Sequence, residues 1–328
     1  MRYIRKRLLI YILTFFFAVT LDWAILRFMP GDPVQAMLSR AGVIAAQAME
    51  ALRGYFIRAF GLDLPLWQQY VNFWRALFKG DFGVSVYLFP KPVSQVLLEA
   101  VPYTVALLVP AILLSWLVGN KFGAFAARRK ILDSTLLPVG YFLTATPYMW
   151  LGLLMAWGLG IALRWFPSGG AYGFGIMPEA SLRFALSLVR HWFLPFLSLF
   201  LVMFGGWAIG MRNMIIYELE ADYSQYLESL GVPRKLIRKY AFRNAMLPQI
   251  TGLALQLGVI AAGAIATEVA FSYPGIGLLL FQAIQNQDYF LVQGCFLFII
   301  FGVLLGNLLV DIICLVVDPR IRRGTVSE

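Results

Sequence analysis

Long apolar stretches alternate along this chain with shorter polar and basic segments. Six stretches are long enough to cross the roughly 30 Å hydrocarbon core of a bilayer as helices of about 20 residues. They cover residues 8–28, 101–125, 136–163, 192–216, 250–271 and 292–317. This pattern predicts an all-α polytopic membrane protein with six transmembrane helices.

The segment between the first two apolar stretches is too hydrophobic for a plain linker. It contains an amphipathic stretch at residues 71–78 and a turn signal at 80–83, Gly-Asp-Phe-Gly. It could form helices lying on the bilayer surface or a small external cap over a pathway. The two interpretations are compatible. The predicted order is an N-terminus with the first helix (1–28), a helical external segment (29–100), a five-helix core (101–317) and a cytoplasmic tail (318–328).

Composition excludes a soluble fold. Of the 328 residues, 60% are hydrophobic and 13% are charged, whereas soluble domains have roughly 25% charged residues. Cys295 and Cys314 would lie on one helix, too far apart for a disulfide. His191 is the single histidine, so no metal site is predicted. The first apolar run is expected to be a retained anchor rather than a cleaved signal.

The net charge of +10 is unevenly distributed. Of 27 lysines and arginines, 17 lie at the two ends of the chain, in the second-to-third and fourth-to-fifth connections, or in the last turns of the apolar stretches that precede these connections. Short basic segments stay on the cytoplasmic side of a membrane. With six crossings, both termini are therefore expected to be cytoplasmic, in a multi-pass protein of the cell membrane.

The fourth-to-fifth connection, residues 217–248, is acidic in its first half and basic in its second. Gly231 suits the left-handed position after a helix, and Pro233 suits the first turn of the next one. Apolar residues recur at helical spacing before that turn, at Tyr223, Tyr226, Leu227 and Leu230. The sequence predicts a helix–turn–helix hairpin on the cytoplasmic face.

Three functions are open to such a hairpin. Binding of nucleic acid is disfavoured, because its first helix is acidic and membrane helices flank it. Its basic half can contact anionic lipid headgroups. The third function is docking of a cytoplasmic protein whose motion reaches the flanking helices.

The residues of this hairpin resemble the "EAA" loop of ABC importer permeases, in the form found in the dipeptide/oligopeptide/nickel family. The resemblance starts at Asp222-Tyr223, passes Gly231 and ends with Arg-Asn-Ala-Met-Leu-Pro at 243–248. Further motifs of that family match at residues 26–33, 80–85, 146–147, 165–170, 268–277, 288–289, 307–311 and 318–320.

The resemblance implies a type I ABC importer permease fold and half of a translocation pathway. It implies as partners two ABC ATP-binding subunits, a second homologous permease and an external solute-binding protein, in a prokaryotic cell membrane. The coupling hairpin would comprise Glu220, Ala221, Asp222, Tyr223, Tyr226, Leu227, Gly231, Arg243, Asn244 and Pro248. The chain has no Gly-Lys pair and hence no P-loop. We expect no enzymatic activity and no bound cofactor; ATP and Mg would be used by partner subunits.

Polar and ionisable side chains inside the apolar stretches cost free energy in the bilayer, so each is expected to serve packing or function. They can pair with neighbouring helices or line a pathway, and small residues at helical spacing can likewise serve helix packing. The candidates are Asp22, Gln249, Gln256, Gly263, Thr267, Glu268, Asn307 and Asp311. Substrate remains open: short peptides are the default of the family, with oligosaccharides or nickel complexes as alternatives. A stand-alone channel or ion-coupled carrier is the competing class.

Overall fold

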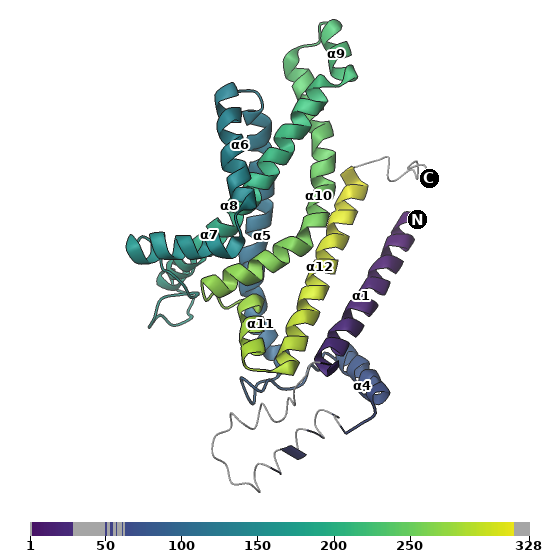
Figure 1. The fold of residues 1–328 in the computed structure, drawn as a ribbon, viewed down its shortest axis with the longest axis vertical. Helices are drawn as coiled ribbons and strands as arrows, with labels where there is room; N and C mark the ends of the chain where they lie inside the picture. The colour runs from purple at the N-terminus through teal and green to yellow at the C-terminus, as the bar shows by residue number, and fades with distance from the viewer. Residues whose placement is uncertain are drawn as a thin grey trace. The chain divides into compact units, whose positions relative to one another are not determined.

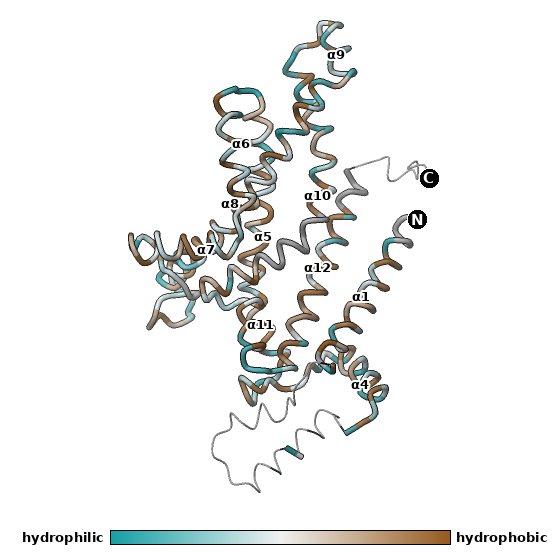
Figure 2. The backbone as a smooth tube through the Cα atoms, in the orientation of Figure 1, coloured by the Kyte–Doolittle hydropathy of each residue, from teal (hydrophilic) through white to brown (hydrophobic). Residues whose placement is uncertain are grey.

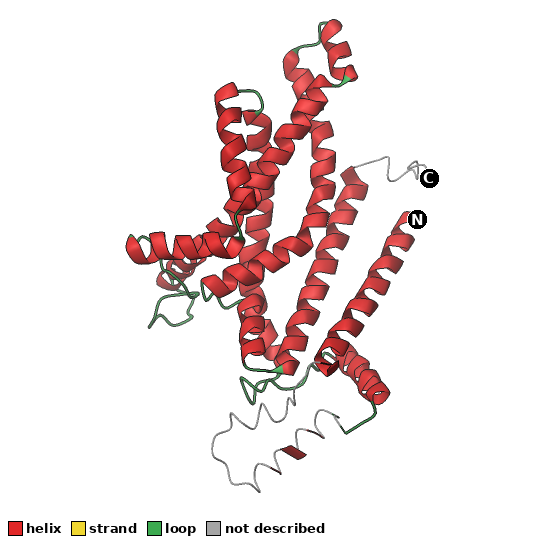
Figure 3. Cartoon of the chain, in the orientation of Figure 1, coloured by secondary structure: helices red, strands yellow, loops and turns green. Residues whose placement is uncertain are grey.

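The computed structural model describes residues 2–28 and 63–317, with residues 50, 53, 54, 57 and 61 between them. Side chains at 2–6, 26, 254–263 and 313–317 lie outside this description. Within the described ranges the secondary structure is helical, apart from one isolated bridge between Val84 and Pro92 (Figure 3). The expected all-α class is confirmed for these residues.

Contacts divide the chain into two units. The first comprises Met1–Pro102 with Gly275–Leu304, and the second comprises Tyr103–Pro274 with Leu305–Glu328. Helix α5 (Val93–Ala126) begins in the first unit and continues in the second. Each unit therefore combines segments that are distant in sequence.

In the first unit, the amphipathic helix α4 (Leu66–Lys79) packs against α1 (Arg2–Phe28) through aromatic side chains. Trp74 stacks on Phe16 with ring centroids 5.5 Å apart, and the hydroxyls of Tyr70 and Thr20 lie 2.8 Å apart. Helix α4 ends at Gly80, whose φ of 69° is in the left-handed region. The amphipathic helix expected at 71–78 is confirmed.

The same unit contains α11 (Ile276–Gln285) and the first part of α12 (Tyr289–Val317). Asp288, fully buried, precedes α12 and caps it by accepting the Leu291 N–H at 3.1 Å. Its other oxygen accepts the Ser85 hydroxyl at 2.6 Å and the Val86 N–H at 2.8 Å. A buried carboxylate needs such donors. They fix the turn after α4 to the start of α12.

In the second unit, α8 (Leu182–Glu220) packs against both α6 (Lys130–Ala145) and α10 (Arg234–Ala270) (Figure 1). An aromatic ladder runs along α8, with Trp192 on Phe196 at 4.3 Å and Phe200 on Phe204 at 5.7 Å. The core of this unit contains Leu107, Ala111, Ala156, Leu194, Phe196, Leu199, Met203, Trp207, Phe271 and Tyr273.

Helices α5 and α8 approach closely at two glycines. A Cβ at Gly123 would clash with the carbonyl oxygen of Ala208, and one at Gly119 would lie 2.8 Å from the Trp207 Cβ. Small residues allow such backbone approach between membrane helices, where packing replaces the hydrophobic effect as the main attraction.

The stretch expected to cross as one helix at 136–163 is broken, so that expectation is wrong in its simple form. Helix α6 ends at Ala145, and the chain then bends by 100° into α7 (Tyr148–Met155). Helix α7 continues without a break as the π-helix η1 (Ala156–Ala162). Pro147 has no N–H to donate and disfavours helical conformation in the residue before it. Thr146 is accordingly extended and its hydroxyl donates to the Phe142 carbonyl at 2.7 Å.

Four helices among the described residues are long and apolar enough to span a membrane: α1, α5, α8 and α12, or five spans if the bent pair is one. Apolar positions recur along α12 (Figure 2). Helix α10 covers the predicted fifth span, but its side chains at 254–263 are outside the description. Six crossings remain a prediction.

Candidate functional site

Helix α9 (Asp222–Ser229) lies between the ends of α8 and α10 in the second unit (Figure 1). Ala221 is extended and separates α9 from α8. After α9, Gly231 takes a φ of 74°, and Pro233 directly precedes α10. This confirms the predicted turn at Gly231 and Pro233. Such a turn forms easily because glycine adopts positive φ at little cost and proline suits a helix start.

Glu218, near the end of α8, connects three helices. Its Oε2 accepts the Tyr223 hydroxyl at 2.6 Å and the Asn244 side-chain amide at 3.2 Å. Its carbonyl oxygen accepts the Ser224 hydroxyl at 2.7 Å. Burial, together with the bond to Glu218, raises the pKa of Tyr223 above its usual value, so the phenol stays a donor at neutral pH. Helix α9 is thereby held to both α8 and α10.

Apolar packing also holds the C-terminal part of α8 against the N-terminal part of α10. Met211 and Ile215 of α8 are buried against Ala245 of α10 and Ala124 of α5. On α9, the Gln225 amide donates to the Glu220 carbonyl at 2.8 Å. The ion pair of Arg234 with Glu228 is exposed on both sides and contributes little. Burial and the Glu218 hydrogen bonds dominate the attachment.

The apolar stripe of α9 is divided, which corrects the expectation that it forms a single face. Tyr223 and Leu227 are half-buried toward the bundle, whereas Tyr226 and Leu230 are 65% and 61% exposed. Asp222 at the helix start is exposed as well, where its charge suits the positive helix end. An exposed aromatic–aliphatic pair at the tip of a hairpin is a candidate docking surface.

The second arm of the hairpin does not end at Pro248, because α10 continues through this residue to Ala270. Arg243, Asn244 and Pro248 are exposed along it, and Ala241 and Ala245 are buried. One continuous helix, with Pro248 inside it, therefore joins the turn at Gly231 to the predicted fifth span.

The polar candidates inside the membrane segments are mostly buried among helices. Glu268 is fully buried and accepts the Thr104 hydroxyl of α5 at 2.7 Å. The Gln249 side chain is buried beside Gly210 of α8, and the Gln249 backbone carbonyl accepts the Trp116 indole N–H at 3.3 Å. These contacts are those of helix packing.

The other candidates of this set differ in burial. Thr267, Asp22 and Asp311 are buried, and Asn307 is half-buried. The Gln256 side chain and the surroundings of Gly263 lie outside the description. No convergence of these positions on one site is visible in the described part of the chain.

Two groups of residues escaped the sequence reasoning. Arg212 of α8 and Asp133 of α6 form a two-pronged ion pair, with both N–O distances 2.7 Å. Glu218 and Ser224 organise the α9 anchor. Their partners are five to 79 residues away in sequence, and nothing in the local periodicity pairs them.

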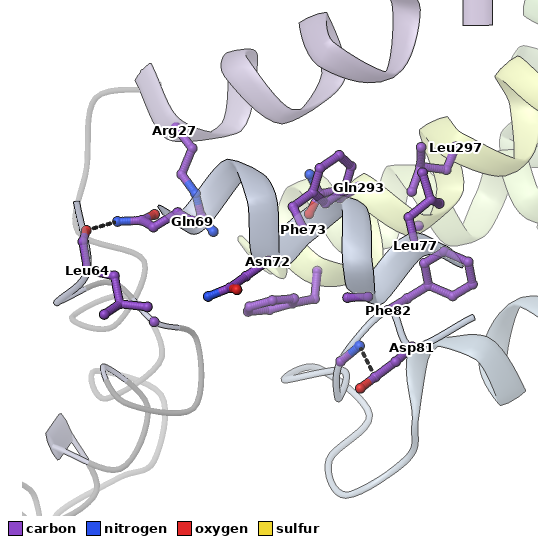
Figure 4. A pocket seen from close by; sticks show the side chains of 15 residues that line it. Arg27, Leu64, Gln69, Asn72, Phe73, Leu77, Asp81, Phe82, Gln293 and Leu297 are labelled. Carbon is purple, nitrogen blue, oxygen red and sulfur yellow. Dashed lines mark hydrogen bonds between the residues drawn. The ribbon is translucent and has the colours of Figure 1, made fainter. Parts of the chain in front are cut away.

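The first unit contains a cavity of about 290 Å³ between α1, α4 and α12. Its lining, labelled in Figure 4, includes Arg27, Gln69 and Asn72 together with Gln293 and Leu297 of α12. Gln69 donates to the Leu64 carbonyl at 2.8 Å. This cavity was not predicted, because its lining combines residues from opposite ends of the chain.

Comparison with known proteins identifies a family and several relatives of nearly equal length. Residues 119–323 match the family described as "Binding-protein-dependent transport system inner membrane component". The di/tripeptide transport system permease protein DppB of Pseudomonas aeruginosa is 32% identical, with 98% of each chain covered. The dipeptide permease DppB of Escherichia coli K12 is 32% identical over 98% of this chain and 99% of its own. The oligopeptide permease AppB of Bacillus subtilis is 28% identical with the same coverage.

Proposed function

The chain belongs to the family of binding-protein-dependent transport system inner membrane components, and from this membership we propose that it forms half of the pathway of a peptide importer driven by partner ATPases. The observation that carries this proposal is the position of α9. It presents Tyr226 and Leu230 outward while Glu218 and Asn244 tie it to two long helices.

Docking of an ATP-binding subunit on α9 would be favoured by the exposed pair, because burying large apolar side chains at an interface centre supplies much of its affinity. Polar positions around the pair, among them Asp222 and Gln225, would form a rim. The buried side of α9, with Tyr223 and Leu227, already packs against the rest of this chain. The two faces of one short helix thus serve two different contacts.

Coupling follows from the linkage of α9 to α8 and α10. Closure of two ATP-binding subunits on ATP would displace α9, and the long helices would carry that displacement into the membrane. ATP shifts the inward- and outward-facing populations only by its differential affinity for the two states. A second homologous permease would complete the pathway, and an external solute-binding protein would deliver substrate.

Short peptides are the proposed substrates. The relatives named above are di/tripeptide, dipeptide and oligopeptide permeases, and the chain aligns with them over nearly its full length. The six-span topology with cytoplasmic termini, and the external placement of 29–100, belong to the same proposal. The membrane-embedded polar residues in contact with neighbouring helices are assigned to packing rather than to ion coupling.

Reconstituted uptake tests this function. The full chain, purified with its ATP-binding subunits and second permease, is placed in vesicles with the binding protein, and ATP-dependent uptake of a labelled dipeptide is measured. Asp222→Arg is expected to abolish uptake while the protein still inserts in the membrane. Asp63→Arg, at an exposed position in the other unit, is the control and should transport normally.

Two results would contradict the proposal. Uptake by the chain alone, without ATP-binding subunits, would indicate a channel or carrier. ATP-driven uptake by Asp222→Arg at the unmodified rate would remove α9 from the coupling path.

A further inference from the structure

Three arginines line one pocket at the start of α8 in the second unit. Arg164 follows η1, whereas Arg183 and Arg190 belong to α8, and together they border a cavity of about 450 Å³. We call this cavity the arginine pocket; it is also lined by Gly160, Trp165, Phe166, Pro167, Ile176, Leu186, Ser187 and His191. It plays no part in the α9 site.

The local fold determines this arrangement. Arg183, Ser187 and Arg190 are spaced four and three residues apart, so they share one face of α8. Ser187 forms hydrogen bonds with other residues instead of the arginines. Its hydroxyl oxygen accepts the Gly173 N–H at 2.8 Å, and its backbone carbonyl lies 2.8 Å from His191 Nδ1. These bonds hold the loop after η1 beside the helix. Arg164, with φ 53°, completes the rim from that loop.

The positive charge of the arginine pocket is not balanced by the described part of the chain. None of the three guanidinium groups has a hydrogen bond or ion pair with another described residue. The pocket lining contains no aspartate or glutamate. A guanidinium presents a planar fork of donors that matches a phosphate group. The pocket therefore favours an anion from outside the chain.

Its surroundings indicate which anion. Trp165 at the rim is 61% exposed, and Leu182, beside Arg183, is 76% exposed. Leu186 and Val189 continue this apolar surface along α8. Exposed aromatic and aliphatic groups directly beside basic ones are typical of the level where a membrane helix leaves the hydrocarbon. A soluble anion would gain nothing from the apolar strip, whereas a lipid would bury its chains there.

We propose that the arginine pocket binds the phosphodiester headgroup of an anionic phospholipid whose acyl chains lie along Leu182, Leu186 and Val189. This lipid would fix the start of α8 and the loop after η1 at the membrane surface. The site rests on α8 spanning the bilayer and is independent of the α9 coupling and of the transported substrate.

Native mass spectrometry of the full chain in detergent tests this proposal directly. Retained adducts are measured during titration with dioleoyl phosphatidylglycerol, with dioleoyl phosphatidylcholine as the neutral comparison. Each basic group near an anionic lipid contributes about a factor of five in affinity. The double variant Arg183→Gln/Arg190→Gln should therefore lose roughly thirtyfold in phosphatidylglycerol affinity and keep its phosphatidylcholine adducts.

A matched control separates a site from general charge. Arg75→Gln/Lys79→Gln removes two exposed charges from α4, in the other unit, and should leave the phosphatidylglycerol affinity within twofold of the unmodified chain. An equal loss in both double variants would overturn the proposal. So would an unchanged affinity in the α8 variant, since its charges would then be irrelevant to lipid binding.

Further measurements distinguish the lipid from other occupants of the arginine pocket, and a loss of affinity from misfolding. Inorganic phosphate should displace the lipid only at far higher concentration; displacement at equal concentration would identify a free anion site instead. Loss of external binding-protein association with lipid adducts intact would identify a protein contact and overturn the lipid assignment. Arg183→Lys/Arg190→Lys retains the charge but not the fork, so an intermediate affinity in a chain with unchanged thermal unfolding supports headgroup recognition.

Discussion

The Tyr223 hydroxyl of α9 donates a 2.6 Å hydrogen bond to the Glu218 carboxylate of α8. Asn244 of α10 donates to the same oxygen at 3.2 Å. One carboxylate oxygen thus connects the short helix to both long helices that flank it. These two hydrogen bonds fix the position of α9 relative to α8 and α10.

Removing the Tyr223 hydroxyl should weaken coupling without removing the docking surface. In Tyr223→Phe the lost hydrogen bond to a charged group costs about 1.5–3 kcal/mol in the attachment of α9. We expect faster hydrogen exchange of the α9 amides and less peptide transported per ATP hydrolysed. Tyr226→Phe is the control, since no hydroxyl hydrogen bond of Tyr226 occurs among the described residues. Equal exchange rates in both variants would contradict the anchoring role.

Gly231→Ala should disturb the turn through backbone conformation alone. A Cβ at Gly231 meets nothing within 4 Å, but its φ of 74° disfavours any L side chain, at a cost of about 1–2 kcal/mol. Gly231→Asn should be milder, because asparagine tolerates this region. Retention of ATP-binding subunits after detergent purification is the measurement. Identical retention by alanine and asparagine variants, both below the unmodified chain, would point to a cause other than φ.

The Asp133–Arg212 pair should stabilise the contact of α6 with α8. Each side chain is about one quarter exposed or less, at 24% and 21%, so solvent screening limits the coupling energy to about 1 kcal/mol. A double-mutant cycle with Asp133→Asn and Arg212→Gln, measured by thermal unfolding in detergent, should show that coupling. Additive effects of the two single substitutions would indicate that the pair contributes nothing to stability.

The close approach of α5 and α8 should tolerate no added methyl group at Gly123. Gly123→Ala places a Cβ against the Ala208 carbonyl, and forcing the helices apart should cost about 1–3 kcal/mol. Gly158→Ala is the control, because nothing lies within 4 Å of its Cβ position. The comparison uses unfolding midpoints in one detergent. A Gly123→Ala midpoint equal to that of the control would show that the helices adjust without cost.

Elements with strong local signals were predictable from the sequence. The turn at Gly231 and Pro233, the amphipathic α4 and the apolar α12 each follow from periodicity or from glycine and proline chemistry. The family was recognisable from motifs spread along the chain, and the relatives confirm it.

Features that depend on tertiary pairing were not predictable. Hydropathy treats 136–163 as one apolar run, although Pro147 lets the chain turn by 100° there. The sequence presents four equivalent apolar residues at 223–230, and only the tertiary fold makes Leu227 half-buried and leaves Tyr226 exposed. Glu218 had no distinguishing pattern, because its partners Tyr223 and Asn244 lie on two other helices.

The most direct measurement of the central claim is the amount of ATP-binding subunit that co-purifies with the Tyr226→Glu/Leu230→Glu chain. Tyr226 on α9 and Leu230 directly after it are both exposed, so the double variant should fold and insert normally. Losing an apolar interface centre and placing charge there should cost several kcal/mol in binding, so we predict that the ATP-binding subunits are lost. Stoichiometric retention of those subunits, with unchanged ATP-driven peptide uptake, would contradict the assignment of α9 as the docking and coupling element.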